Sequence, residues 1–223
     1  TKFLENLVFK YADISTSVSK KEQNKIKSYY KSKTILLPNG ITIESFDKNK
    51  KINFDYLIYS GSYFYKPNKD AIDYLNYKIM PKLIIKYPNL KLVLTGGGFN
   101  KKEFPWIINE GIITKRKLYN LLYFSKGLCV PLKFGSGTRI KILEALCLGA
   151  IVISSKKGIE GIDLRVINPP YVIKKESNYI SKIFEILKNN QKIKKKSVEN
   201  KKYYLQKYSM IKIVQKFINE NKI

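Results

Sequence analysis

The sequence predicts an α/β protein with a doubly wound, Rossmann-like parallel sheet, and three observations lead to that class. Short continuous apolar runs alternate with segments of helical spacing from Tyr56 onward. Most of these runs are followed within a few residues by a glycine, such as Gly61 after Tyr59 and Gly96 after Leu94. Within the runs, polar residues do not alternate with apolar ones, which is typical of strands buried on both faces. We therefore expect a parallel sheet covered by helices, with ligands bound at the carboxyl ends of its strands.

Five apolar runs are expected to form the strands of that sheet. They span residues 56–59, 90–94, 107–108, 128–132 and 151–153. Segments with helical spacing lie between or after them, at 67–84, 115–124, 139–148, 176–189 and 203–219. Pro81 predicts a kink in the first of these helices, and Gly149 predicts the end of the third.

Residues 1–55 follow a less regular pattern. Residues 11–18 and 35–37 are predicted to be short strands, and 20–30 a polar helix. Pro38-Asn39-Gly40 is a strong turn signal. Residues 46–55 are charged and polar, so we interpret them as a linker to the regular part of the chain.

The composition excludes several classes of active site. The 223 residues include no histidine, which removes histidine general bases, nucleophile–histidine pairs and histidine-ligated metals. The two cysteines, Cys129 and Cys147, lie in apolar segments and are expected to be core residues, so they predict neither a zinc site nor a disulfide framework. No Asp-x-Asp motif occurs, and no metal site is predicted.

The chain carries a large excess of positive charge. Lysine and arginine number 43 against 17 aspartates and glutamates, which gives a formal net charge of +26. Such a field attracts nucleotide phosphates, an anionic membrane surface or nucleic acid. Nearly all of the basic residues are lysine, whereas nucleic-acid recognition favours arginine, so nucleic acid is the least favoured of these partners. The simplest alternative is a solvated, lysine-rich surface without a specific partner.

A glycine-rich turn between a strand and a helix carries the sharpest signal for a binding site. Gly135-Ser136-Gly137-Thr138 follows the strand 128–132, and Arg139 opens the next helix. Backbone N–H groups and the positive dipole end of a helix bind anions, and glycines let a phosphate approach the backbone. Arg139 and Lys141 place positive charge at a helix N-terminus, which is itself partially positive, so the three repel one another. A bound anion would offset this repulsion.

Lys141 and Glu144 lie three residues apart on what is expected to be the polar face of this helix. One interpretation is an ion pair on the surface. The other assigns Lys141 to a phosphate and Glu144 to a ribose hydroxyl. The pattern alone leaves both interpretations open.

Several segments match one family in order and spacing. They are Leu36 to Gly40, Gly61 with 65–68, 92–96, 111–113, 135–145, 149–155, 158–161 and 208–210. Together they resemble the C-terminal, donor-binding half of GT-B glycosyltransferases of family four, the retaining "glycosyl transferases group 1" enzymes. Residues 135–145 resemble the GGGTRLKILEA-like loop of one subgroup. The sequence departs from many members at Ser136, where they carry glutamate, and at Ser62 and Pro67, where they carry arginine and lysine.

The resemblance implies a role for each matching residue. Arg139, Lys141 and Glu144 would be the catalytic residues, with the two cations at the pyrophosphate and Glu144 at the ribose. The other donor-binding positions would be Gly61, Ser62, Ile112, Gly135, Ser136, Gly137 and Thr138. Among these, Ile112 would contact the base. The donor substrate would be a nucleotide-diphosphate sugar, UDP or GDP, and no cofactor would be required.

The resemblance also implies a domain plan and an activity. Residues 1–45 would be a remnant of the N-terminal acceptor domain, 46–202 the nucleotide-sugar-binding domain, and 203–223 a helix that packs back on the N-terminal domain. The acceptor domain would be mostly absent, so a separate partner would supply it. The expected activity is hexosyl transfer to a glycan or lipid-linked acceptor in polysaccharide biosynthesis, in the cytoplasm and near the inner face of an anionic membrane.

Two other functions stay open. The chain could be a non-catalytic nucleotide- or sugar-binding subunit, or a fragment of a split enzyme, with the same fold. It could also be a basic nucleic-acid-binding protein, which the scarcity of arginine disfavours.

Overall fold

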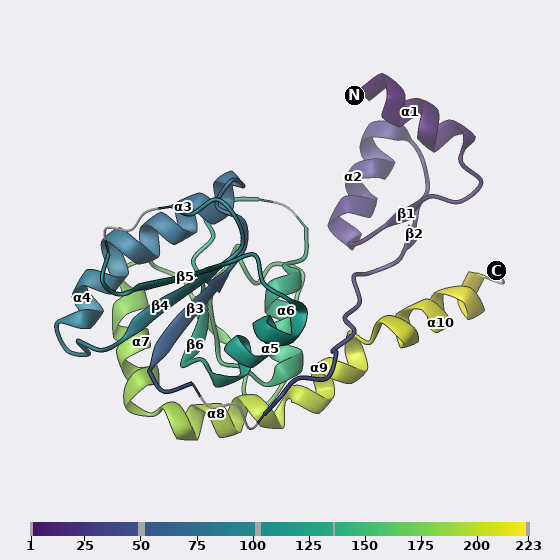
Figure 1. Cartoon of the computed structure of the whole chain (residues 1–223). Helices are drawn as coiled ribbons and strands as arrows, with labels where there is room; N and C mark the ends of the chain where they lie inside the picture. The colour runs from purple at the N-terminus through teal and green to yellow at the C-terminus, as the bar shows by residue number, and fades with distance from the viewer. Residues whose placement is uncertain (1, 49–51, 101–103, 136, 222–223) are drawn as a thin grey trace. The chain divides into compact units, whose positions relative to one another are not determined.

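The structure is a computed structural model that describes residues 2–48, 52–100, 104–135 and 137–221. The chain divides into two units (Figure 1). One unit is formed by residues 1–42 together with 206–223, and the other by residues 43–205.

The larger unit, residues 43–205, is built on a six-stranded parallel sheet. Its strands are β3 (Tyr56–Ser60), β4 (Lys91–Thr95), β5 (Ile107–Gly111), β6 (Gly127–Val130), β7 (Val152–Ser155) and β8 (Tyr171–Ile173). They lie in the order β5-β4-β3-β6-β7-β8, and every neighbouring pair is parallel. This is the doubly wound order, so the predicted fold class is confirmed. The strand β8 was not predicted, because its three residues carry no extended apolar run.

Helices cover both faces of this sheet. They are α3 (Lys66–Tyr74), η1 (Leu75–Ile79), α4 (Met80–Ile84), α5 (Lys115–Phe124), α6 (Ile140–Leu148), α7 (Asn178–Lys188), α8 (Asn190–Glu199) and α9 (Lys201–Lys207). The helices α3, α4 and α7 lie on one side of the sheet, and α5 and α6 pack together on the other (Figure 1). The lysine-rich α8 was not predicted, since it buries only Ile193.

The kink predicted at Pro81 takes the form of a π-helical turn. Between α3 and α4, residues Leu75–Ile79 form η1, and the N–H of Met80 donates to the carbonyl of Leu75. Pro81 then stands in the first turn of α4. Proline has no N–H and its ring crowds the preceding turn, so widening that turn lets the helix continue past it.

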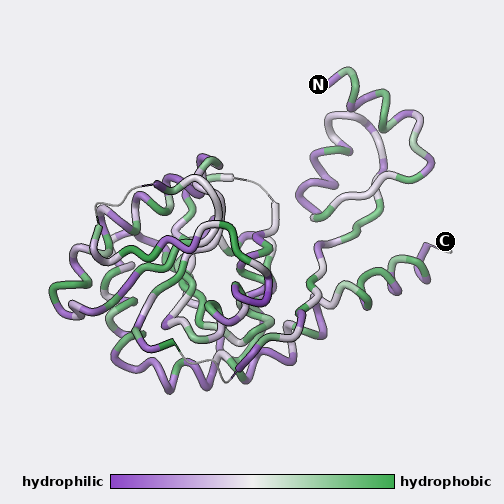
Figure 2. The backbone as a smooth tube through the Cα atoms, in the orientation of Figure 1, coloured by the Kyte–Doolittle hydropathy of each residue, from purple (hydrophilic) through white to green (hydrophobic). Residues whose placement is uncertain are grey.

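The core of the larger unit is the sheet itself. All of Tyr56, Leu57, Ile58 and Tyr59 in β3 are at most 1% exposed. Figure 2 shows hydrophobic colour gathered in the strands and hydrophilic colour along α8. The two cysteines are free, buried core residues, as predicted. Burial raises the pKa of the Cys129 thiol, and that of Cys147, to about 12, so both are protonated and unreactive near neutral pH.

The smaller unit contains α1 (Lys2–Tyr11), β1 (Thr16–Ser17), α2 (Lys20–Tyr30), β2 (Ile35–Leu36) and α10 (Met210–Asn221). The strands β1 and β2 pair in parallel. The hydroxyl of Ser19 caps α2 by accepting from the N–H of Glu22 at 3.2 Å. None of α1, α2 and α10 has a buried residue.

Two predictions for the chain ends are corrected. Residues 11–18 are not one strand, because Tyr11 ends α1 and only Thr16 and Ser17 pair with β2. The predicted helix 203–219 is broken at Tyr208 and Ser209 into α9 and α10. At this break the backbone of Ile41 forms two hydrogen bonds. Its N–H donates to the carbonyl of Tyr208 at 2.6 Å, and its carbonyl accepts from the N–H of Met210 at 3.2 Å.

Across the described residues, no helix is long and apolar enough to span a bilayer.

Candidate functional site

The strand order reverses between β3 and β6, and this point of the sheet is where doubly wound folds bind ligands. The chain leaves β3 through the loop that starts at Gly61, and leaves β6 through the loop that reaches Arg139. Both loops lie at the carboxyl edge of the sheet, because all six strands are parallel. The sequence-predicted site residues of both loops therefore meet at one place.

The loop after β3 is held in place by the loop after β4. The N–H of Gly61 donates to the carbonyl of Thr95, and that of Tyr63 to the carbonyl of Gly97, both at 2.8 Å. A Cβ on Gly96 would lie 2.6 Å from the carbonyl carbon of Gly61, so no larger residue fits there. These contacts fix the backbone of the first loop before any ligand binds.

Lys141 reaches from α6 into this first loop. Its Nζ donates to Oδ1 of Asn68 at 3.0 Å and lies 4.2 Å from the centroid of the Tyr59 ring. Asn68 is itself held by the Tyr59 hydroxyl, which donates to the same Oδ1 at 2.8 Å. A Cβ on Gly61 would lie 2.7 Å from Nζ of Lys141, so glycine at 61 is required for this approach. The structure thus brings Gly61 and Lys141 together.

The ammonium group of Lys141 is buried without a carboxylate partner among the described residues. Burial, and secondarily the charge of Arg139, lower the pKa of Lys141 from 10.5 to about 7. A buried cation beside another cation is unfavourable unless an anion joins them. The surroundings of Lys141 therefore favour a bound anion.

Arg139 and the start of α6 add to this positive region. Arg139 is the residue before α6, and no side chain caps this helix end or places an acid in its first turn. Gly135 has φ +112°, and a Cβ there would lie 2.6 Å from Nη2 of Arg139. The helix dipole and two cations therefore converge where the sequence predicted an anion site.

Glu144 does not pair with Lys141 on the surface, so that interpretation is wrong. Its side chain is 6% exposed, and it forms an ion pair with Lys115 at the start of α5. The hydroxyl of Tyr119 lies 3.5 Å from the same carboxylate oxygen. Sequence reasoning missed Lys115, although it stands three residues after Ile112 at the beginning of a predicted helix.

The structure describes four of the five remaining predicted positions. Ile112 follows β5 and is 88% exposed. The Ser62 hydroxyl accepts from the N–H of Phe64 at 3.3 Å. Gly137 has φ +79°, and a Cβ added to it would meet open space. A Cβ added to Gly161 would lie 3.4 Å from Oγ1 of Thr138. Ser136 lies outside the described residues.

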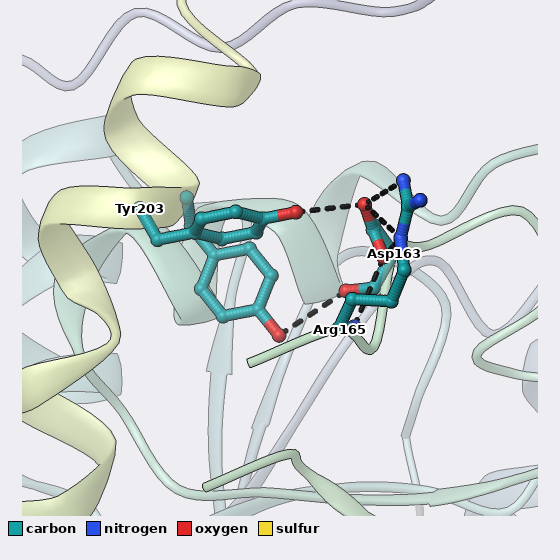
Figure 3. Close-up of polar contacts among 4 residues, drawn as sticks. Asp163, Arg165 and Tyr203 are labelled. Carbon is teal, nitrogen blue, oxygen red and sulfur yellow. Dashed lines mark hydrogen bonds and ion pairs between the residues drawn. The ribbon is translucent and has the colours of Figure 1, made fainter. Parts of the chain in front are cut away.

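A second polar cluster has a structural explanation. The carboxylate of Asp163 accepts from Nε and Nη2 of Arg165 and, at 2.7 Å, from the hydroxyl of Tyr203 (Figure 3). The hydroxyl of Tyr204 donates to the carbonyl of Asp163 at 3.3 Å. This cluster fastens the connection between β7 and β8 to α9. The described residues contain no group of three or more cysteine, aspartate or glutamate side chains that could hold a metal ion.

Solved structures with the same fold are numerous but distant in sequence. A Staphylococcus aureus TarM mutant, in complex with fondaparinux, α-GlcNAc-glycerol and UDP, has a TM-score of 0.75 at 14% identity, over 96% of this chain and 45% of that one. Sucrose-phosphate synthase from Thermosynechococcus elongatus has a TM-score of 0.74 at 16% identity, over 99% and 60%. Anabaena HepE with UDP-glucose has a TM-score of 0.70 at 15% identity, over 97% and 65%.

These structural similarities establish the fold. The chain spans less than two thirds of the length of each of these structures. No curated protein matches the sequence. A family model described as "Glycosyl transferases group 1" matches residues 55–189, which include the whole sheet and the site between β3 and β6. The chain therefore belongs to the glycosyl transferases group 1 family.

Proposed function

We propose that the larger unit is the donor domain of a retaining hexosyltransferase of family four and binds a nucleotide-diphosphate sugar. The buried ammonium of Lys141 carries this proposal, because it lies beside Arg139 and the start of α6 with no described carboxylate as its partner. A diphosphate supplies negative charge to the ammonium group of Lys141. Solved structures of TarM with UDP and of HepE with UDP-glucose support a uridine donor, and GDP is the alternative.

The proposed roles are those that the resemblance to the family implies. The diphosphate lies against Gly61, Ser62 and the loop from Gly135 to Thr138, Ser136 included, with Lys141 at its centre. Glu144, held by Lys115, accepts from a ribose hydroxyl. Ile112, which is 88% exposed, contacts the base.

The proposed reaction is a group transfer that the positive site assists. The bond between the anomeric carbon and the diphosphate oxygen breaks, and both electrons go to the diphosphate. The acceptor hydroxyl oxygen bonds to the anomeric carbon on the same face, and its proton leaves with the diphosphate. Lys141 and Arg139 stabilise the charge that develops on the leaving group, which is the step that needs no histidine.

The acceptor is a glycan or lipid-linked sugar. It is held by an N-terminal acceptor domain to which residues 1–45 belong and on which residues 203–223 pack back. The +26 charge favours a position beside anionic lipid, at the cytoplasmic face where polysaccharides are assembled. Vesicles with and without phosphatidylserine test this location. Binding that depends on the anionic lipid and weakens with salt is expected, and equal binding to both vesicles contradicts it.

Thermal unfolding with UDP, GDP and ADP, each with and without its sugar, tests the donor site. At a ligand concentration about 100 times the dissociation constant, binding adds about 2.7 kcal/mol to the free energy of unfolding. That raises the midpoint by about 5–10 °C in a domain of this size. Lys141→Ala should remove the shift, and Lys82→Ala, an exposed lysine on α4, should keep it.

The outcomes separate the proposal from its alternatives. A shift with one nucleotide, lost in Lys141→Ala, supports the donor site and identifies the base. Turnover of the sugar nucleotide when an acceptor domain is added then distinguishes an enzyme from a non-catalytic subunit. An unchanged midpoint with every nucleotide would overturn the proposal.

A further inference from the structure

Phe64 is an aromatic side chain that the fold leaves in solvent at the edge of the site. Its side chain is 84% exposed, in the loop between β3 and α3. Ile112, beyond the end of β5, is 88% exposed. Both side chains therefore stand at the carboxyl edge of one sheet, in loops that follow the strands β3 and β5.

Both side chains border the glycines that follow β4. A Cβ on Gly97 would lie 3.5 Å from Cδ1 of Ile112 and 3.9 Å from Cε2 of Phe64. A Cβ on Gly98, which has φ +93°, would lie 2.9 Å from the Phe64 ring. The glycines therefore do more than make a turn, because they leave room for the ring to lie across the backbone.

The backbone that carries Phe64 is fixed although its ring is free. The neighbouring Tyr63 donates its N–H to the carbonyl of Gly97 at 2.8 Å and its hydroxyl to Oδ1 of Asp73 at 2.8 Å. The Tyr63 ring also packs edge-on against Phe99. Tyr63 thus anchors the loop, and a loop whose backbone is already fixed loses little conformational entropy when a ligand binds.

We propose that Phe64 stacks on the nucleobase of the bound donor, with Ile112 as a second apolar contact across Gly97. This inference rests on the proposed function and extends it. The phosphate centre at Lys141 lies between β3 and β6, whereas Phe64, Gly97 and Ile112 follow β3, β4 and β5, which are adjacent strands. The site thus has a cationic end and an apolar, aromatic end, as a nucleoside diphosphate has an anionic end and a flat base.

Calorimetric titration of UDP, GDP and inorganic pyrophosphate into four proteins tests this inference. The proteins are the wild type, Phe64→Ala, Phe64→Trp and the matched control Tyr65→Ala. Tyr65 is in the same loop and 52% exposed. Base–aromatic stacking predicts that Phe64→Ala weakens the affinity for the nucleotide by about 5- to 150-fold, or about 1–3 kcal/mol. Affinity for pyrophosphate should stay the same, and Phe64→Trp should bind the nucleotide as tightly as the wild type.

Each outcome decides between the two proposals. Equal nucleotide affinity in Phe64→Ala and the wild type overturns the stacking role and leaves the donor site intact. Equal losses for nucleotide and pyrophosphate also overturn it, because they show that Phe64 acts on the fold of the loop. A wild-type protein that binds no nucleoside diphosphate overturns the donor site and the stacking role together.

Discussion

The helices α6 and α10 both carry many apolar residues, yet only one of them is buried. In α6, seven of nine residues are buried, from Ile142 to Leu148. In α10, no residue is buried, and Met210, Ile211, Val214 and Ile218 are between 38% and 65% exposed. The sequence of each helix has apolar residues at helical spacing. The two units differ in the size of the β-sheet against which the helix can pack.

The unit of α6 provides a six-stranded sheet, whereas the unit of α10 provides two strands of two residues each. So short a sheet cannot bury the apolar face of a helix. The helix α1 shows the same exposure, with Phe3, Leu4, Val8 and Tyr11 all above 60%. Apolar spacing therefore predicts a helix, while burial depends on how complete the rest of the layer is.

Truncating one apolar side chain in each helix gives the largest expected contrast. Leu143 in α6 is 0% exposed, and Leu143→Ala should destabilise the larger unit by about 2–5 kcal/mol. Val214 in α10 is 38% exposed, and Val214→Ala should change the unfolding free energy by less than about 0.5 kcal/mol. Urea unfolding of the whole chain measures both. Similar losses from the two variants would break the comparison, because they would show that α10 is buried in solution.

Substitutions at the ion pair between Lys115 and Glu144 should give a smaller difference in stability. Lys115→Ala would leave the buried Glu144 carboxylate without its cation, and we expect a loss of about 1–3 kcal/mol. Glu144→Gln should cost less than about 1 kcal/mol, because the side chain of Lys115 is 52% exposed and water can solvate it. Urea midpoints of the two single variants measure the difference. Equal losses would mean that the pair acts only through its mutual attraction.

The pH dependence of nucleotide binding should distinguish the buried lysine of α6 from the exposed lysines of α10. Without a ligand, the pKa of Lys141 is about 7, so above pH 7 its side chain is mostly neutral. A bound diphosphate favours the charged form and raises that pKa, so binding takes up a proton above pH 7. The affinity should therefore fall as the pH rises from 7 to 9, by up to about tenfold per pH unit.

Titration calorimetry between pH 7 and 9 checks this slope. Lys212→Ala, an exposed position on α10, should keep the slope of the wild type. Lys141→Arg should bind with little dependence on pH in this range, because arginine stays charged. A slope that persists in Lys141→Arg would assign the proton to another group.

The local elements of the larger unit could be predicted from sequence, and the contacts between them could not. The spacing around Lys115 and Phe124 predicts α5 with its observed bounds, since its apolar and polar faces are distinct. By contrast, β8 has three residues and follows Pro169-Pro170, so no local pattern marks it. The site divides in the same way. The resemblance to a family places Lys141 at the site, but its contact with Asn68, 73 residues away, depends on the packing of two loops. The pairing of Glu144 with Lys115 depends on how α5 and α6 lie together.

The pairing of β3 with β6 also has a kinetic consequence. In this register Leu57 lies opposite Gly127, so the two central strands join residues 70 positions apart. The chain between them must be looped before this ladder forms, and such long-range pairings slow folding. Once formed, the ladder links the two halves of the sheet. Hydrogen exchange should therefore find the amides of β3 and β6 among the slowest in the molecule, released only when the whole larger unit unfolds.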